Sequence, residues 1–329
     1  MNSIFTALSY KALTLFLSFV ALFMTVEAPA TDDAIVFEDD VLMSAVLWGD
    51  TQIADYKPGR YFCLKNAVTD LANSESNIDA LVIAGDIAEN GKNAEYKLVL
   101  DCLALADNVD NHILTVGNHD VRLRRYSKVV ERFEEICLAA NEKLDMSALS
   151  YKEGKLTYSY EVNGYTFVVL GTDKTKFEES YFTSECLEWL DAELEKATED
   201  GKPVFVILHQ PLKETHQVWQ AWNSPDDKAG TVGEQSDELL EIMNRYDNLF
   251  LITGHLHMGF SHEWSVHEIG NFWGINLPGI GPNNADGDYY NASGTGYIME
   301  VREDSVTFRA RDFNLGKYIS DYDVKIDLK

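Results

Sequence analysis

Basic residues are scarce in this 329-residue sequence. Lys and Arg number 27 against 54 Asp and Glu, which gives a formal net charge of −27 at pH 7. Nucleic acids and anionic membrane surfaces are bound mainly through Lys and Arg side chains. The charge balance therefore argues against a nucleic acid or an anionic membrane as the partner.

Cysteine is also rare, and its four positions match no zinc-binding spacing. Each Cys lies in a helix-like segment among apolar neighbours, so we do not expect metal binding by thiolates. In an oxidising compartment the favoured disulfide is Cys63 with Cys102, because successive crossover helices can lie side by side. The alternative is four reduced, buried thiols, Cys63, Cys102, Cys137 and Cys186.

Long apolar runs are confined to the start of the chain. Lys11 precedes the apolar segment 12–26, and Ala28-Pro29-Ala30 offers the small residues that signal peptidases prefer. We expect residues 1–30 to be a secretory signal peptide; an uncleaved anchor is the alternative, because the apolar character extends back to Ile4. Both interpretations predict a secreted or surface-anchored protein. Since no repeat or low-complexity linker follows, residues 31–329 are expected to form one domain.

The first half alternates short apolar runs with helical spacing. Strands are predicted over 41–47, 80–84 and 112–116, with helices over 61–73, 93–107 and 126–141. Such alternation is typical of right-handed crossovers and a parallel sheet.

The second half mixes this pattern with hairpins. Strands 156–162 and 166–170 flank Asn163-Gly164, a strong hairpin signal. A helix over 182–198 precedes the strand 204–208, and a helix over 236–246 precedes the strand 249–253. Mainly β structure is predicted after that, near 263–269, 272–277, 297–302 and 306–311. The expected fold is α/β, with two packed mixed β-sheets forming a sandwich flanked by helices.

Polar residues that can bind metals follow five of these strands abruptly. Open α/β sheets place their sites at the carboxyl ends of strands. A single Asp, Asn or His in such a place would more often be a turn or buried core residue. Five together predict one site, built from Trp48-Gly49-Asp50-Thr51-Gln52, Gly85-Asp86, Gly117-Asn118-His119-Asp120, Leu208-His209-Gln210-Pro211 and Gly254-His255-Leu256-His257.

The order Asp-x-Gln, Gly-Asp, Gly-Asn-His-Asp, His-x-Pro and Gly-His-x-His resembles the calcineurin-like metallophosphoesterase superfamily, which includes purple acid phosphatases and cyclic-nucleotide phosphodiesterases. The resemblance implies two metal ions bridged by Asp86 and by a hydroxide that attacks phosphorus. It assigns Asp50, Gln52 and His257 to one ion. It assigns Asn118, His209 and His255 to the other. Mixed oxygen and imidazole ligands favour Mn, Fe, Zn or Co.

His255 and His257 are expected to lie on an extended segment, where residues i and i+2 point to the same side. His119 is a catalytic residue by resemblance, donating to a phosphoryl oxygen or protonating the leaving group. Glu89 is the first candidate to orient it, and Asp120 is the competitor.

Two positions depart from the family pattern. Many members have His where this chain has Gln52, which can bind a metal only through a neutral amide oxygen or through water. Purple acid phosphatases carry a metal-binding Tyr where this chain has Glu89, so no purple chromophore is expected.

These observations predict a metal-dependent phosphoesterase acting on small phosphate mono- or diesters. The alternatives are a phosphodiesterase or pyrophosphatase for nucleotide-type substrates, and an inactive family member that binds a partner.

Three further features stay open. Arg122, Arg124 and Arg125 could hold a leaving group or simply begin a solvated helix. His216, Trp219 and Trp222 could form a wall of the site or pack over the domain. The glycines Gly279, Gly281 and Gly287 are expected in a surface loop.

Overall fold

The fold is taken from a computed structural model that describes residues 33–141, 150–151, 154–216, 230–260, 265–282 and 292–329. The predicted signal peptide, Trp219, Trp222 and Gly287 lie outside these ranges. Within them, no helix is long and apolar enough to cross a membrane.

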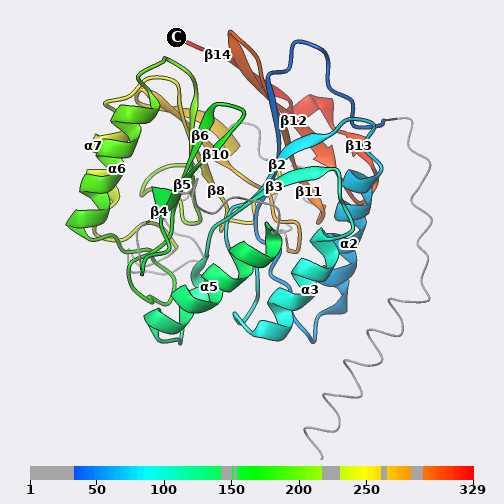
Figure 1. The fold of residues 1–329 in the computed structure, drawn as a ribbon, viewed down its shortest axis with the longest axis horizontal. Helices are drawn as coiled ribbons and strands as arrows, with labels where there is room; N and C mark the ends of the chain where they lie inside the picture. The colour runs from blue at the N-terminus through cyan, green and yellow to red at the C-terminus, as the bar shows by residue number, and fades with distance from the viewer. Residues whose placement is uncertain (1–32, 142–149, 152–153, 217–229, 261–264, 283–291) are drawn as a thin grey trace, which may run out of the picture.

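Two seven-stranded sheets form the centre of the molecule, as predicted (Figure 1). The first sheet has the order β13-β12-β11-β1-β2-β3, with β14 beside β12, and the second has the order β4-β5-β6-β7-β8-β10-β9. The strands of the first sheet are β1 (Met43–Trp48), β2 (Ile78–Ile83), β3 (Val109–Leu114), β11 (Thr295–Val301), β12 (Ser305–Asp312), β13 (Lys317–Tyr318) and β14 (Val324–Asp327). Those of the second are β4 (Ser150–Tyr151), β5 (Tyr158–Val162), β6 (Tyr165–Leu170), β7 (Val204–Leu208), β8 (Leu249–Thr253), β9 (Val266–Ile269) and β10 (Phe272–Asn276).

The first sheet is parallel at one end and antiparallel at the other, whereas the second has a parallel centre between antiparallel flanks. β1, β2 and β3 run parallel to one another, and so do β6, β7, β8 and β10. The hairpin of β5 and β6 and the later strands β11 and β12 pair antiparallel. The carboxyl ends of the parallel strands in a sheet therefore share one edge, which is where the predicted ligands follow.

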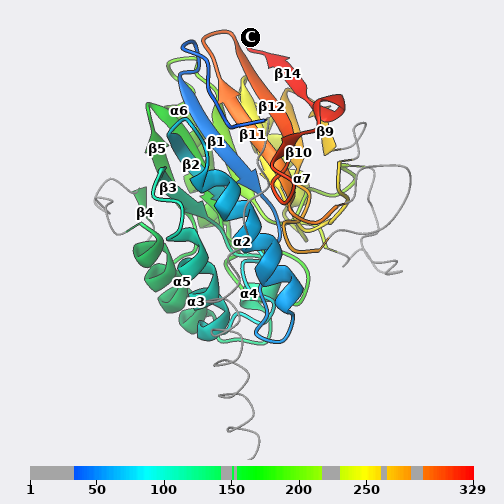
Figure 2. The ribbon, with the colours of Figure 1, turned by 90° about the vertical axis from the view of Figure 1, so that its right-hand side faces the viewer.

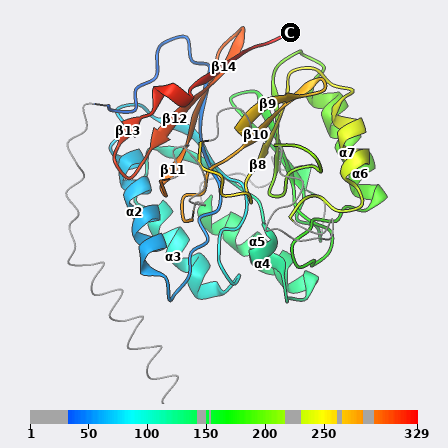
Figure 3. The same ribbon diagram turned by 180° about the vertical axis from the view of Figure 1, so that it is seen from behind.

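Helices cover the outer faces of both sheets (Figures 2 and 3). On one side lie α2 (Pro58–Ala72), α3 (Asn93–Leu103) and α5 (Tyr126–Ala140); on the other lie α6 (Ser184–Ala197) and α7 (Ser236–Met243). Side chains alternate along each strand, and β7 shows the result. Phe205 and Ile207 belong to the core between the sheets, whereas Val204, Val206 and Leu208 pack with residues of α6 and α7.

Two expectations about connecting segments are wrong. Helix α3 ends at Leu103 rather than near residue 107, because the chain turns there to enter β3. Gly279 and Gly281 are buried rather than on the surface: Ile280 and Gly281 donate to the backbone of Gly49 and Asp50 at 2.9 and 3.0 Å.

The disulfide between Cys63 and Cys102 is not formed, and neither is any other between the four cysteines, all of which are described. Helices α2 and α3 do pack together, as expected. The Cys102 thiol, however, pairs with the Tyr61 hydroxyl, and burial raises the pKa of Cys102 to about 12.

A buried ion pair fixes α2 to the first sheet. Arg311 on β12 donates from Nε and Nη2 to the two carboxylate oxygens of Asp70 at 2.7 and 2.8 Å. Arg311 is 1% exposed, and its third nitrogen donates to the backbone oxygen of Asp33. The pKa of Asp70 is raised, because the effect of burial exceeds the opposite effect of the Arg311 charge.

Arg311→Ala is expected to lower the free energy of unfolding by about 3–5 kcal/mol, because it leaves the Asp70 carboxylate buried without its partner. Urea denaturation measures the loss. The exposed pair of Lys97 and Asp101 is the control, and Lys97→Ala should cost no more than about 0.5 kcal/mol. Equal effects of the two substitutions would contradict the role given to the buried pair.

Candidate metal centre

The five strand-end stretches meet at one place between the two sheets. Asp50, Asp86 and Asn118 follow β1, β2 and β3 of the first sheet, and His209 follows β7 of the second. His255 and His257 come after β8. All six side chains are buried, with Asp50 and His209 fully so. The predicted ligands are therefore brought together, although they come from positions up to 207 residues apart.

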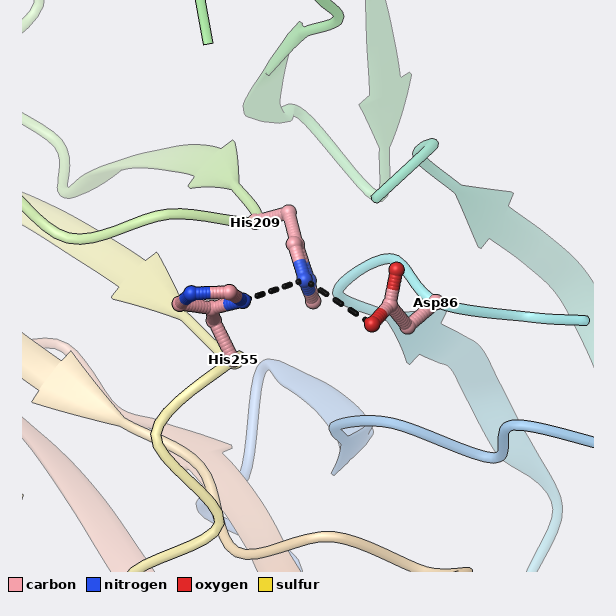
Figure 4. Close-up of side chains that lie close together, drawn as sticks. All are labelled: Asp86, His209 and His255. Carbon is pink, nitrogen blue, oxygen red and sulfur yellow. Dashed lines mark hydrogen bonds and ion pairs between the residues drawn. The ribbon is translucent and has the colours of Figure 1, made fainter. Parts of the chain in front are cut away.

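The imidazole of His209 lies at the middle of this group (Figure 4). Its Nε2 is 3.4 Å from Asp86 Oδ2, 3.2 Å from Asn118 Oδ1 and 3.2 Å from His255 Nδ1. The ligand atoms of Asp86, His209 and His255 all lie within 4.8 Å of one another. Such a spacing suits a single metal ion.

Asp50 and His257 form the other side of the group. His257 Nε2 is 2.9 Å from Asp50 Oδ1, which in turn lies 4.0 Å from His209 Nε2. Asp50 and His257 thus pair with each other, and the division of the ligands between two ions stays a prediction.

Each buried carboxylate divides its two oxygens between backbone and site. Asp50 Oδ2 accepts the backbone N–H of His255 at 2.8 Å, while Oδ1 faces His257. Asp86 Oδ1 accepts the backbone N–H of His119 at 2.8 Å, while Oδ2 faces His209. The same two side chains thus fix neighbouring loops and present one oxygen each to the centre.

The loops adopt a left-handed backbone at most of these positions. Asp50, Gln52, Asp86, His255 and His257 have φ between 40° and 71°. The expected extended segment around His255 and His257 is therefore wrong. A tight turn, in which Leu256 N–H donates to Gly254 O at 2.8 Å, directs the two rings to opposite ends of the group instead. Non-glycine residues take this conformation only where surrounding contacts impose it.

The charges of the group act strongly on one another. Burial lowers the pKa of His209, but Asp86 and Asp50 raise it, to about 10. Burial raises the pKa of Asp86, which His209 outweighs, so the pKa lies below its usual value. The pKa of Asp50 is also below its usual value, because the charge of His257 outweighs the effect of burial. Burial and the neighbouring His209 lower the pKa of His255 to about 3. The centre therefore favours a positive charge beside its two carboxylates.

A family model for calcineurin-like phosphoesterases matches residues 43–259 of the chain, the stretch that contains all of these side chains. The protein belongs to this family.

Two curated relatives and two solved structures are similar to this calcineurin-like phosphoesterase. The relatives are named "Probable glycerophosphodiester phosphodiesterase GpdQ" of Arcobacter nitrofigilis, 25% identical over 61% of the chain, and "Probable cyclic nucleotide phosphodiesterase syc0937_d" of Synechococcus sp., 26% identical over 55%. The chain spans 65% and 59% of their respective lengths.

The solved structures show the same fold. A dimetal phosphatase from Danio rerio superposes with a TM-score of 0.60 at 15% identity, over 88% of this chain and all of that one. The purple acid phosphatase PPD1 of yellow lupin gives a TM-score of 0.59 at 12% identity, over 87% of this chain and 53% of that one.

The donor atoms of this family member fit metal ions. His209 Nδ1–H donates to the Ala84 carbonyl at 2.8 Å, so Nε2 faces the centre and would offer a lone pair to a metal ion that replaces its proton. Asn118 Oδ1, Asp86 Oδ2 and Asp50 Oδ1 present lone pairs around the same point. Lone pairs that converge in a buried space repel one another unless a cation lies among them.

Gln52 contacts the predicted metal centre through its amide nitrogen, whereas metal binding through its amide oxygen was expected. Its Nε2 donates to Asp86 Oδ2 at 3.0 Å, so the amide nitrogen rather than the oxygen faces the carboxylate. The structure thus shows Gln52 as a hydrogen-bond donor to Asp86. Its role as a metal ligand stays a prediction.

His119 lies at the rim of the centre, with 17% of its side chain exposed. Its Nε2 is 3.9 Å from Asp86 Oδ2, and its Nδ1 is 2.9 Å from the backbone oxygen of Glu89. Glu89 therefore contacts the ring through its backbone oxygen, and its carboxylate lies 4.0 Å from Nδ1 while it pairs with Lys57 at 3.0 Å and with Arg60.

Asp120 is not the orienting residue. Its carboxylate accepts the backbone N–H groups of Ile87, Ala88 and Gly117 and the hydroxyl of Tyr96, at 2.8–3.1 Å. Burial and the charge of Asp86 raise the pKa of Asp120 to about 6. Asp120 holds the loops after β2 and β3 against each other.

Of the three arginines, Arg122 alone contacts these residues directly. Its Nη2 is 2.7 Å from His119 Nδ1, whereas Arg124 donates to the Asn90 backbone and Arg125 precedes α5 on the surface. His216 is buried against the ring of His267, which supports packing rather than a wall of the site.

Two contacts beside the predicted ligands were not predicted from the sequence. Glu178 accepts from Asn118 Nδ2 at 2.7 Å, and Gln210 donates to the backbone oxygen of Glu178 at 2.8 Å. Gln210 directly follows the predicted ligand His209 in the sequence, and this position could have indicated that it lies near the site. Glu178 lies in a loop with no strand directly before it, so no local pattern pointed to it.

Gly117→Ala is expected to weaken metal binding about tenfold or more, because the added Cβ would overlap Asp86 Oδ1 and the Asp86 backbone nitrogen. Gly59→Ala is the control: a Cβ there meets nothing within 4 Å, and helix α2 should gain up to about 1 kcal/mol. Titration of the two metal-free variants with Mn²⁺ measures the difference. Unchanged affinity in Gly117→Ala would contradict the packing described.

Proposed function

We propose that this protein hydrolyses phosphate esters of small molecules as a metal-dependent phosphoesterase. The observation that carries the proposal is the convergence of Asp50, Asp86, Asn118 and His209 donor atoms beside His119, in a member of the calcineurin-like phosphoesterase family. Both curated relatives are named as phosphodiesterases, which supports a diester as the first substrate to test.

The ligand residues would hold two ions in the division given above, with Asp86 shared. When bound, such ions supply Lewis acidity, which lowers the pKa of water and offsets charge on phosphoryl oxygens. The donor set of carboxylate, amide and imidazole suits Mn, Fe, Zn or Co.

His119 would act on the substrate directly. Its backbone N–H donates to Asp86, so the ring is held beside the Asp86 carboxylate and remains accessible from solvent. From there Nε2 can donate to a phosphoryl oxygen or protonate the departing alkoxide.

Arg122 supports that role by selecting the tautomer of His119. A guanidinium can only donate, so its contact with Nδ1 at 2.7 Å requires a lone pair there and leaves the proton on Nε2. The carbonyl of Glu89, at 2.9 Å from Nδ1, would favour the opposite tautomer. The charged guanidinium makes the stronger of these two opposed contacts, so we infer that Arg122 is a positioning residue that prepares His119 as a donor.

His119→Ala is expected to retain both ions and to lose about 10²–10⁴-fold in kcat, because the proton donor is gone and the ligands remain. Asp86→Asn should lose metal, since a shared ligand loses its charge. Metal analysis of each purified variant, beside kcat for bis(p-nitrophenyl) phosphate, makes the comparison. Equal metal loss in both variants would contradict the separate roles.

The substrate class can be decided with paired esters. The wild-type protein is expected to hydrolyse bis(p-nitrophenyl) phosphate with a higher kcat/KM than p-nitrophenyl phosphate, and a chelator should abolish both activities. A panel of cyclic nucleotides, nucleotide diphosphates and glycerophosphodiesters then narrows the choice. Metal-free protein with no chelator-sensitive activity would instead favour an inactive, partner-binding member of the family.

A further inference from the structure

An acidic side chain from outside the five strand-end loops contacts one of the predicted ligands. Glu178 lies in the segment between β6 and α6, and its Oε2 accepts from Asn118 Nδ2 at 2.7 Å. Asn118 is 1% exposed, and its Oδ1 lies 3.2 Å from His209 Nε2. One end of the amide therefore faces Glu178 and the other end faces the metal centre.

The orientation of this amide decides what Asn118 offers to an ion. The oxygen and nitrogen ends have nearly the same shape, so packing alone does not distinguish them. A turn of 180° would direct the N–H₂ group toward the centre, where it would repel a cation and could not coordinate it. An ionised Glu only accepts hydrogen bonds, so Glu178 selects the orientation that points Oδ1 inward.

Glu178 is itself held firmly from the side of His209. Gln210 Nε2 donates to the Glu178 backbone oxygen at 2.8 Å, and Gln210 Oε1 accepts from the Ser180 hydroxyl. Gln210 and Ser180 are both buried, and Gly233 N–H donates to the Ser180 carbonyl at 3.3 Å. The loop after β7 thus supplies both the ligand His209 and the residue that clamps Glu178 in place.

The second oxygen of Glu178 faces a different partner. Arg122 Nη1 lies 3.6 Å from Oε1, and the face of Phe177 lies 5.4 Å from the same guanidinium. Because Oε1 is engaged by Arg122, Oε2 is the atom left to Asn118. The carboxylate consequently connects the Asn118 ligand with the arginine that contacts His119.

We propose that Glu178 is a positioning residue that orients the Asn118 amide oxygen toward the metal centre, and that Gln210 fixes Glu178 for this purpose. The inference rests on the proposed function, because it presumes that the centre binds ions. It adds a residue outside the ligand set on which the affinity for one of the two ions depends.

The first test compares neighbouring glutamates. Metal-free Glu178→Ala is titrated with Mn²⁺ by calorimetry, beside Glu179→Ala. Glu179 is the matched control, because its carboxylate pairs with Lys176 at 3.6 Å rather than with Asn118. Glu178→Ala should bind one ion about 10–100-fold more weakly and the other normally, and Glu179→Ala should bind both as wild type does. Thermal unfolding of the metal-free variants verifies that each is folded.

The second test reverses the polarity of the hydrogen bond. Glu178→Gln should weaken Mn²⁺ binding when residue 118 is Asn, because a Gln side chain accepts either orientation of the amide. In the Asn118→Asp background the same substitution should strengthen binding, since Gln donates to the new carboxylate while Glu repels it. A double-mutant cycle detects this change of sign, which a purely structural tether of the loop would not produce.

The outcomes separate the inference from the function. Wild type that binds two ions, with Glu178→Ala behaving as Glu179→Ala does, would overturn the inference alone. So would an equal loss on Glu178→Gln in both backgrounds. Wild type that binds no Mn²⁺ would overturn the proposed function, and the inference with it. Selective loss of one ion together with the change of sign would support both.

Discussion

Two carboxylates buried at the ends of neighbouring strands impose the constraint on which the rest of the structure depends. Asp50 and Asp86 are at most 1% exposed, and a buried charge is costly unless hydrogen bonds and opposite charge surround it. The backbone N–H groups of His255 and His119 satisfy one oxygen of each. Gln52 and His257 contact the remaining oxygens, and cationic charge balances them further, either as a proton on His209 or as a metal ion in its place.

This constraint explains the unusual backbone around the centre. Loops from two sheets must approach closely enough for main-chain N–H groups to reach the carboxylates. At Gly254 a Cβ would lie 2.6 Å from Asp50 Oδ2 and 2.9 Å from the Ala84 oxygen, so the approach leaves room for glycine only. The left-handed conformations of the ligands follow from the same crowding, and the hydrogen bonds to Asp50 and Asp86 offset their cost.

The long-range contacts of these two carboxylates also limit how much could be predicted from the sequence. The runs 204–208 and 249–253 match β7 and β8 residue for residue, because a buried strand bounded by polar residues is a local signal. Both sheets and the meeting of the six side chains followed from such runs. The turn at His255 was not predictable, because the carboxylate that imposes it lies 205 residues away in sequence. Glu178 was not predicted for the same reason, because only the fold brings it into contact with Asn118, which lies 60 residues earlier.

The charge of the chain raises a last question, which is how a protein with a net charge of −27 could bind an anionic ester. Beyond about 8–10 Å the repulsion is screened by salt, so the local balance decides. At the rim, Arg122 is paired with Glu178, and Lys57 and Arg60 share the one carboxylate of Glu89, so three cations face two carboxylates and leave a single positive charge. Inside, the two carboxylates leave a negative excess. Two divalent ions would reverse its sign, since they add four positive charges against two negative ones. In such a centre the ions are needed to hold the substrate as well as to activate water, so substrate binding and chemistry should depend on the same ligands.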